Sequence, residues 1–176
     1  SHQIPPHMKR LTLLKRSLMF LLLIGLVHIA RGQSEVTRPA SHFGFQPGTD
    51  RMLFDYGQLM DYLRKVEQAS PRVRLEQIGQ SPMGKPIYVA FFSSPENIDN
   101  LEKLRGINRE LALNPNLSEQ QRTTYLQEGK VFFTATLSMH ASEVGPSQAA
   151  PLIAYQLATT EHPDTLRWLD DVVYMM

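Results

Sequence analysis

The chain has 176 residues, enough for one globular domain, and a formal net charge of +1. Residues 1–32 contain five basic residues and no acid, so the rest of the chain carries −4, five charges below the total. An acidic body without a basic patch argues against a nucleic-acid-binding protein. Because there is no cysteine, disulfides are excluded and any zinc must be bound by His, Asp or Glu.

Residues 1–32 have the pattern of upstream residues followed by a signal peptide. Basic residues precede an apolar run from Ser17 to Ala30, which is shorter than the roughly 20 residues of a membrane span. Small residues at Ala30 and Gly32 predict cleavage before Gln33. We therefore expect a secreted or periplasmic protein without stable membrane insertion after cleavage, and an uncleaved anchor is the alternative.

The next part of the chain is predicted to contain helices and a hairpin. In chain order we expect an extended segment over residues 33–50, an amphipathic helix over residues 55–69, strands over residues 73–79 and 87–92, and helices that start at Ser94–Pro95 and at Ser118. The first helix is indicated by the i, i+4, i+7 spacing of Leu59, Leu63 and Val66. Turn residues between the two strands predict an antiparallel hairpin at one edge of a sheet.

The stretch from Val131 to Leu157 is predicted to be a buried strand, a tight loop and a helix. Aromatic and β-branched residues indicate a strand over residues 131–137. The helix is expected from about Pro146, since proline suits a first helical position. Pro151 predicts a late start or a kink, because an interior proline costs about 3 kcal/mol. A further buried strand is predicted over residues 172–176.

The loop between that strand and helix carries His140 and Glu143 in an H-x-x-E spacing. Ligands of open α/β sheets bind outside the carboxyl ends of the strands, and both side chains are good zinc ligands. A catalytic zinc needs a third protein ligand and an open position for water. The alternative is a structural pair, in which His140 is a hydrogen-bonded core residue and Glu143 is a first-turn acid favoured by the helix dipole.

Three stretches together resemble the M14 family of zinc carboxypeptidases. The segment SMHASEVGPSQAA is similar to the first metal motif of the family, and the stretch from Ile78 to Ile87 is similar to its early hairpin. The stretch from Asp171 to Met176 resembles the strand that leads into the Asn-Pro-Asp-Gly loop of the family. The resemblance covers about residues 43–176, and the order of the elements is more specific than any single motif.

The resemblance implies an α/β fold with a three-layer mixed sheet and flanking helices, truncated after about four strands. Residues 51–176 would be the N-terminal part of a peptidase M14-like domain. His140 and Glu143 would be two of the three ligands of Zn²⁺ in a secreted metallocarboxypeptidase that acts on a peptide or muropeptide. The remaining ligand, the substrate clamp and the general base of the family follow the last predicted strand, so no residue here is assigned to them.

Two other functions stay open at this point. One is a non-catalytic secreted binding module that keeps the fold without the metal. The other is a zinc deacylase or amidase built on the same scaffold. Because the later catalytic residues are absent, we expect the 176-residue chain itself to be inactive.

Overall fold

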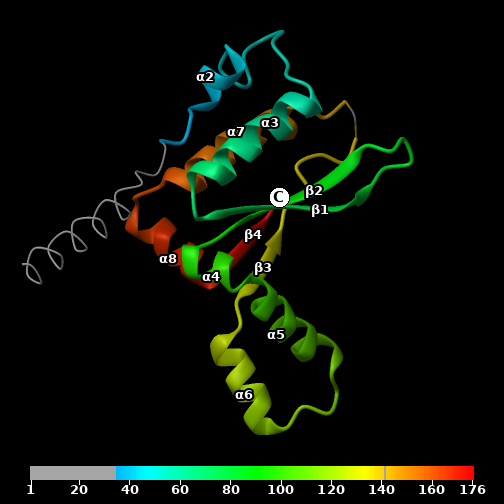
Figure 1. Ribbon diagram of the computed structural model, residues 1–176, viewed down its shortest axis with the longest axis vertical. Coiled ribbons are helices and arrows are strands. Elements are labelled where there is room, and N and C mark those ends of the chain that lie inside the picture. Colours follow the sequence, from blue (N-terminus) through cyan, green and yellow to red (C-terminus); the bar gives the residue numbers. More distant parts are fainter. Residues whose placement is uncertain (1–34, 141) are drawn as a thin grey trace, which may run out of the picture. The chain divides into compact units, whose positions relative to one another are not determined.

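The computed structural model describes residues 35–140 and 142–176, so the upstream residues and signal peptide predicted over residues 1–32 lie outside the described residues. The described part contains seven helices and four strands (Figure 1). The helices are α2 (Pro39–Phe43), α3 (Tyr56–Ala69), α4 (Pro95–Asp99), α5 (Leu101–Leu113), α6 (Glu119–Glu128), α7 (Val144–Thr159) and α8 (Pro163–Asp171). The strands are β1 (Val73–Gln80), β2 (Pro86–Phe92), β3 (Val131–Thr134) and β4 (Val172–Met175).

The four strands form one mixed sheet in the order β1-β2-β4-β3 (Figure 1). β1 and β2 are antiparallel, and Gly84 in the turn between them has a φ of +72°, a left-handed value that favours glycine. β4 pairs antiparallel with β2 and parallel with β3. The predicted hairpin at one edge of the sheet is confirmed, and β3 forms the opposite edge.

The core consists of two buried clusters that share the sheet. Phe92 belongs to a cluster with α3 and α7, whereas its neighbour Phe91 belongs to a cluster with α4 and α5. This division follows from the alternation of side chains along a strand. The helical members of the clusters are Met60, Tyr62, Leu63 and Val66 from α3, Ala154 and Ala158 from α7, Ile98 from α4, and Leu101 and Leu104 from α5.

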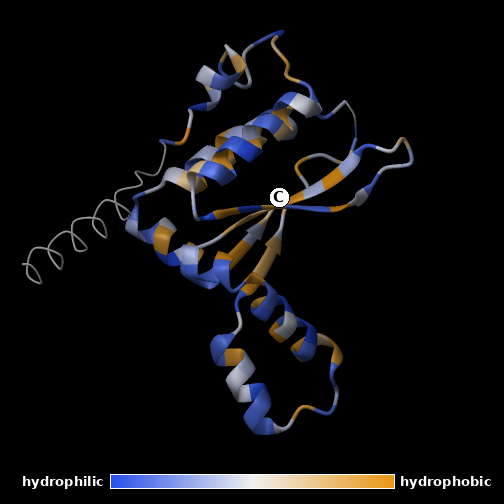
Figure 2. Cartoon of the chain, viewed as in Figure 1, coloured by the Kyte–Doolittle hydropathy of each residue, from blue (hydrophilic) through white to orange (hydrophobic). Residues whose placement is uncertain are grey.

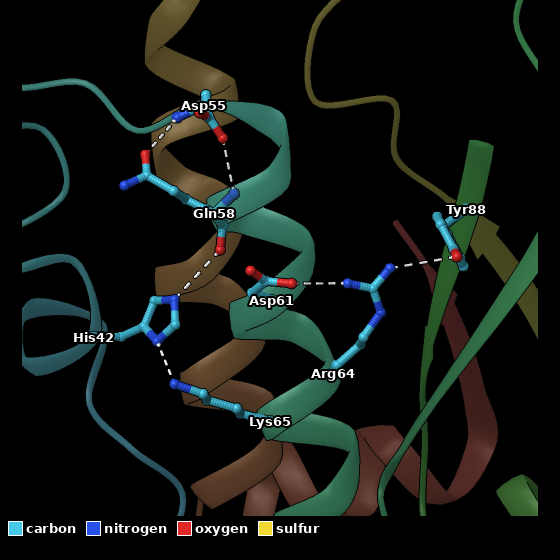
Figure 3. Close-up of polar contacts among 7 residues, drawn as sticks. All are labelled: His42, Asp55, Gln58, Asp61, Arg64, Lys65 and Tyr88. Carbon is cyan, nitrogen blue, oxygen red and sulfur yellow. Dashed lines mark hydrogen bonds and ion pairs between the residues drawn. The ribbon is translucent and has the colours of Figure 1, made fainter. Parts of the chain in front are cut away.

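The helix predicted over residues 55–69 is confirmed as α3, with Asp55 as its N-cap (Figure 3). The Asp55 side chain accepts a hydrogen bond from the Gln58 backbone N–H at 2.9 Å, and the Gln58 side chain accepts one from the Asp55 backbone N–H at 2.9 Å. Two N–H groups that a helix start leaves unpaired are thereby satisfied. The buried face of α3 includes Leu63 and Val66 of the predicted stripe.

The segment predicted as extended over residues 33–50 contains the short helix α2 and is therefore not extended throughout. Pro39 starts this helix, and Gly44 ends it with a φ of +77°. His42 fastens the segment to α3: its Nε2 lies 3.3 Å from the Gln58 carbonyl oxygen, and its Nδ1 lies 3.2 Å from Lys65 Nζ (Figure 3).

The strand predicted over residues 131–137 is shorter than expected and is not buried. β3 ends at Thr134, and the Val131 and Phe133 side chains are 62% and 53% exposed. Hydrophobic sequence alone does not reveal which strand lies at an edge, where neighbours cover only one side. The strand predicted over residues 172–176 is β4, and it is buried at Val173 and Tyr174.

α7 begins at Val144, earlier than predicted, and continues through Pro151. The expectation of a late start is therefore wrong. Pro151 is buried on the same helix that contributes Ala154 to the core, so tertiary packing outweighs the intrinsic cost of the ring.

The helices α5 and α6 pack together, and α6 has no buried residue. Figure 2 shows α6 as mostly hydrophilic, which agrees with its exposure. The predicted capping box at Ser118 is confirmed, because the side chains and backbones of Ser118 and Gln121 exchange hydrogen bonds.

Within residues 35–140 and 142–176, no helix has both the length and the apolar character that a membrane crossing requires.

A buried polar network positions the start of β4. The Asn97 side chain donates to the carbonyl oxygens of Leu169 at 3.2 Å and Asp170 at 3.0 Å. Ser93 is fully buried, and its hydroxyl lies 2.8 Å from the carbonyl oxygens of Leu169 and Val172. These bonds tie the end of α8 to the beginning of α4, and so they fix where β4 enters the sheet.

Asn97→Ala is expected to lower the free energy of unfolding by about 1–3 kcal/mol, because it removes the buried amide that donates to the Asp170 carbonyl and to the Ser93 hydroxyl. Asn100→Ala is the matched control, since the Asn100 side chain donates to the Glu96 carbonyl at an exposed position. Urea denaturation of both variants measures the difference. Equal losses for the two variants would contradict a structural role for the buried network.

Candidate metal centre

The structure brings together the two predicted metal ligands. They lie on the loop between β3 and α7, just past the carboxyl end of β3. His140 Nδ1 lies 2.6 Å from Glu143 Oε1, and the two side chains are 68% and 43% exposed. Because its side chain is exposed, His140 is not a core residue, and that alternative is excluded. The short distance shows that the imidazole and the carboxylate converge.

The Glu143 carboxylate is held by the backbone of its own loop. Its Oε2 accepts hydrogen bonds from the N–H groups of Met139 at 3.0 Å and His140 at 3.1 Å. The Ser138 hydroxyl donates to the His140 carbonyl at 2.8 Å. Although Glu143 is the N-cap residue of α7, its side chain makes no cap hydrogen bond, because it turns back toward the loop.

These hydrogen bonds lower the pKa of the Glu143 carboxyl below its ordinary value. The bond from the His140 side chain is the largest cause, and the backbone N–H groups of Met139 and His140 add to it. An ionised carboxylate can only accept, so Nδ1 of His140 carries the proton in this pair.

We expect the loop geometry to be pH-dependent through Glu143. The pKa of Glu143 is lower in the folded state than its ordinary value, so the ionised carboxylate stabilises the folded loop at pH values above the ordinary pKa of glutamic acid. This stabilisation is lost as the pH falls through the folded-state pKa. A ¹³C NMR titration of the Glu143 carboxyl measures the midpoint. In His140→Ala the midpoint should rise, since the largest cause is removed. An unchanged midpoint would contradict the assignment of that cause.

The donor types of this pair fit zinc, which takes imidazole nitrogen and carboxylate oxygen at about 2.0–2.2 Å. Two ligands of a tetrahedral ion at such distances stand about 3.3 Å apart, so the observed 2.6 Å is a hydrogen bond that metal binding would replace. His140 Nδ1 must therefore give up its proton before it can coordinate a metal. Within the described ranges, no group of three His, Cys, Asp or Glu side chains could hold a metal ion.

An apolar cavity of about 430 Å³ borders the loop that carries the pair. It lies between α3, α7 and the strands, and its lining includes Leu59, Leu63 and Ala90 in addition to Ser138 and Ser147, which flank His140 and Glu143 in the sequence. A cavity of this size lies within the range of ligand pockets, which are mostly apolar with a few polar groups.

A second cavity, of about 350 Å³, lies between residues 47–53 and the first turns of α7. Gln148 lines it and is only 6% exposed, and its Oε1 has no hydrogen-bond partner among residues 35–140 and 142–176. The sequence motifs did not predict a role for this residue. Its sequence context could have indicated a buried polar group, because Gln148 is a long polar residue in a stretch of α7 that is otherwise rich in Ala, Pro and Leu.

Gln148→Met is expected to raise the free energy of unfolding by about 1 kcal/mol, because it replaces an unpaired buried polar group with an apolar side chain of similar length. Thermal or urea denaturation measures the change. Gln121→Met serves as the control, since Gln121 makes its cap hydrogen bonds at an exposed position and its loss should destabilise. A large destabilisation by Gln148→Met would show that Gln148 has a partner in solution.

A comparison with known protein families found one match. The family model for zinc carboxypeptidases, peptidase M14, matches residues 59–176, which is more than half of the 176-residue chain. No curated protein and no solved structure matches the chain. The matched region contains α3, the whole sheet, and the loop with His140 and Glu143. The chain therefore belongs to the peptidase M14 family of zinc carboxypeptidases.

Proposed function

We propose that this chain is the N-terminal portion of a secreted, zinc-dependent metallocarboxypeptidase that hydrolyses the C-terminal peptide bond of a peptide or muropeptide. The observation that carries the proposal is the convergence of His140 and Glu143 at the carboxyl end of β3, in a member of a zinc carboxypeptidase family. The proposal is supported by an exposed imidazole and an ionised carboxylate that lie 2.6 Å apart, and by the zinc that the matched family is named for.

In the proposed mechanism, His140 and Glu143 hold the metal and this part of the chain positions both ligands. Zinc held there would supply Lewis-acid chemistry: it would polarise the scissile carbonyl and lower the pKa of a water molecule. The N–H groups of Met139 and His140 keep the Glu143 carboxylate ionised and fixed in direction. His140 would bind the metal as a neutral imidazole through the ring nitrogen that carries no proton.

The remaining groups would come from outside the described residues. Among residues 35–140 and 142–176, no third His, Cys, Asp or Glu side chain joins the pair. A cation that holds the substrate carboxylate and a carboxylate base would complete the site. The free edge of β3, with Val131 and Phe133 exposed, supports further strands beyond it and a completed three-layer sheet.

The test compares two blocked peptides of identical sequence, one with a free C-terminal carboxylate and one with a C-terminal amide. We expect the 176-residue chain with zinc to cleave neither. A polypeptide that continues through the missing ligands is expected to release one residue from the free-carboxylate peptide alone, as measured by mass spectrometry. Zinc-dependent cleavage by the 176-residue chain itself would overturn the proposed division of the site.

A non-catalytic secreted binding module is the second candidate, and one observation favours it: the described residues supply only two converging metal ligands. This alternative predicts that the longer polypeptide binds peptides without cleaving them. The same mass-spectrometric assay distinguishes the two functions.

A further inference from the structure

His42 fastens the arm formed by residues 35–53 to α3 through both nitrogens of its ring (Figure 3). Its Nε2 lies 3.3 Å from the Gln58 carbonyl oxygen, and its Nδ1 lies 3.2 Å from Lys65 Nζ. A carbonyl oxygen can only accept a hydrogen bond, whereas an ammonium group can only donate one. These contacts therefore require the neutral form of His42 that carries its proton on Nε2.

A second proton on His42 would break this arrangement. The acceptor at Nδ1 would become an N–H group that faces the Lys65 ammonium at 3.2 Å, so a hydrogen bond would be lost and two like charges would meet. An imidazole in water takes up this proton at about pH 6.5, so the change lies within the physiological range.

The other titratable groups of α3 near His42 leave this repulsion in place. The Asp61 carboxylate, one turn before Lys65, pairs with the Arg64 guanidinium at 2.9 Å (Figure 3). The Tyr62 ring packs against the imidazole with centroids 5.1 Å apart and is uncharged at acid and neutral pH.

The groups on α2 and α7 add no compensating negative charge. On α2, the N-cap Arg38 lies one turn before His42 and is positive. α7 also packs against α2, but its sequence has no charged residue, and its titratable group is Tyr155. A positive charge is favoured in the last turn of a helix, where His42 lies, but α2 has only five residues and hence a small dipole.

The beginning of the arm has a separate attachment that does not involve His42. Val36 is buried in the core, and the Tyr62 hydroxyl donates to the Thr37 carbonyl at 3.0 Å. Burial raises the pKa of Tyr62 above its ordinary value, so this hydrogen bond persists at acid and neutral pH. Loss of the His42 contacts would therefore loosen the part of the arm that follows α2, while its beginning stays in place.

We propose that His42 is a pH-sensitive latch, which holds the arm on α3 when it is neutral and loosens the arm when it is protonated. Residues 47–53 of the arm line the cavity against the first turns of α7, and Glu143 is the N-cap of that helix. Loosening the arm opens this cavity at the start of the helix that follows the metal loop. The inference goes beyond the proposed peptidase function and does not depend on zinc.

The test follows the arm with a nitroxide label, which a single introduced cysteine can carry because the chain has none. Gln46→Cys places the label at an exposed position of the arm, and Thr123→Cys places it on exposed α6 as a control. From about pH 8 to about pH 5, the ratio of mobile to immobile label in the electron paramagnetic resonance spectrum should rise about tenfold at position 46. It should stay constant at position 123.

His42→Gln keeps a donor and an acceptor but cannot titrate, so it should abolish the response, and Lys65→Met should reduce it because the facing charge is gone. His140→Ala should keep the response, so a failure of the metal site and a failure of this inference are distinguishable. ¹H–¹⁵N spectra at about pH 8 should show the His42 proton on Nε2. A pH-independent label at position 46, an equal response in His42→Gln, or a proton on Nδ1 would each overturn the latch.

Discussion

Phe92→Ala is expected to lower the free energy of unfolding by about 3–5 kcal/mol. Phe92 is fully buried on β2, and its ring lies 6.1 Å from that of Tyr174 on β4, so the two rings join neighbouring strands of the sheet. Removing the ring leaves a cavity between the sheet and the α3–α7 face, where Val66 and Ala154 are also buried. Such a loss is a large fraction of the stability of a small domain.

Phe133→Ala is the matched control for this prediction, because it makes the same substitution at an exposed position on the edge strand. The Phe133 side chain is 53% exposed and stacks on Tyr174 with centroids 5.9 Å apart. We expect it to cost less than about 1 kcal/mol. Urea denaturation of the full chain measures both variants. Similar losses would contradict the placement of the core on the α3–α7 face.

His140→Ala is expected to weaken zinc binding by on the order of 100-fold or more. Loss of an outer-shell partner alone costs 10–100-fold in metal affinity, and a direct ligand should cost at least as much. Titration of the full chain against a competing chelator measures the change. The fold should be retained, because the His140 side chain is 68% exposed and contributes nothing to the core.

His162→Ala is the control for zinc binding. His162 is the N-cap of α8, where its Nδ1 accepts a hydrogen bond from the Asp164 N–H at 3.3 Å. Its replacement should weaken that helix start without affecting zinc. Equal zinc affinity of wild type and His140→Ala would contradict the metal site, as would a similar loss in His162→Ala.

Local chemistry made much of the fold predictable. The stripe of α3, the hairpin and the capping box at Ser118 depend on residues close in sequence, and all three are confirmed. The exposure of β3 was not predictable, since Val131 and Phe133 read as core residues and only the strand order reveals that they lie at an edge. The start of α7 was missed for a related reason, because the packing of the whole helix decides where it begins.

The convergence of His140 and Glu143 was predictable from the sequence, but the hydrogen bonds around them were not. The spacing of His140 and Glu143 across a strand-to-helix loop indicated that they would converge, and they do. The pKa of Glu143 is lowered by hydrogen bonds from the His140 side chain and from the backbone N–H groups of Met139 and His140. These bonds depend on the conformation of the loop, which the motif does not specify. The buried acceptor of Gln148 was missed because its environment is formed by residues 47–53, nearly 100 positions earlier.

The most direct test is a crystal structure of the full chain grown with zinc, in which anomalous diffraction at the zinc edge locates the metal. We expect one zinc ion within about 2.2 Å of a His140 ring nitrogen and a Glu143 carboxylate oxygen, with the hydrogen bond between the two side chains broken. Zinc bound elsewhere, with the 2.6 Å contact between His140 and Glu143 intact, would contradict the metal site on which the proposed function depends.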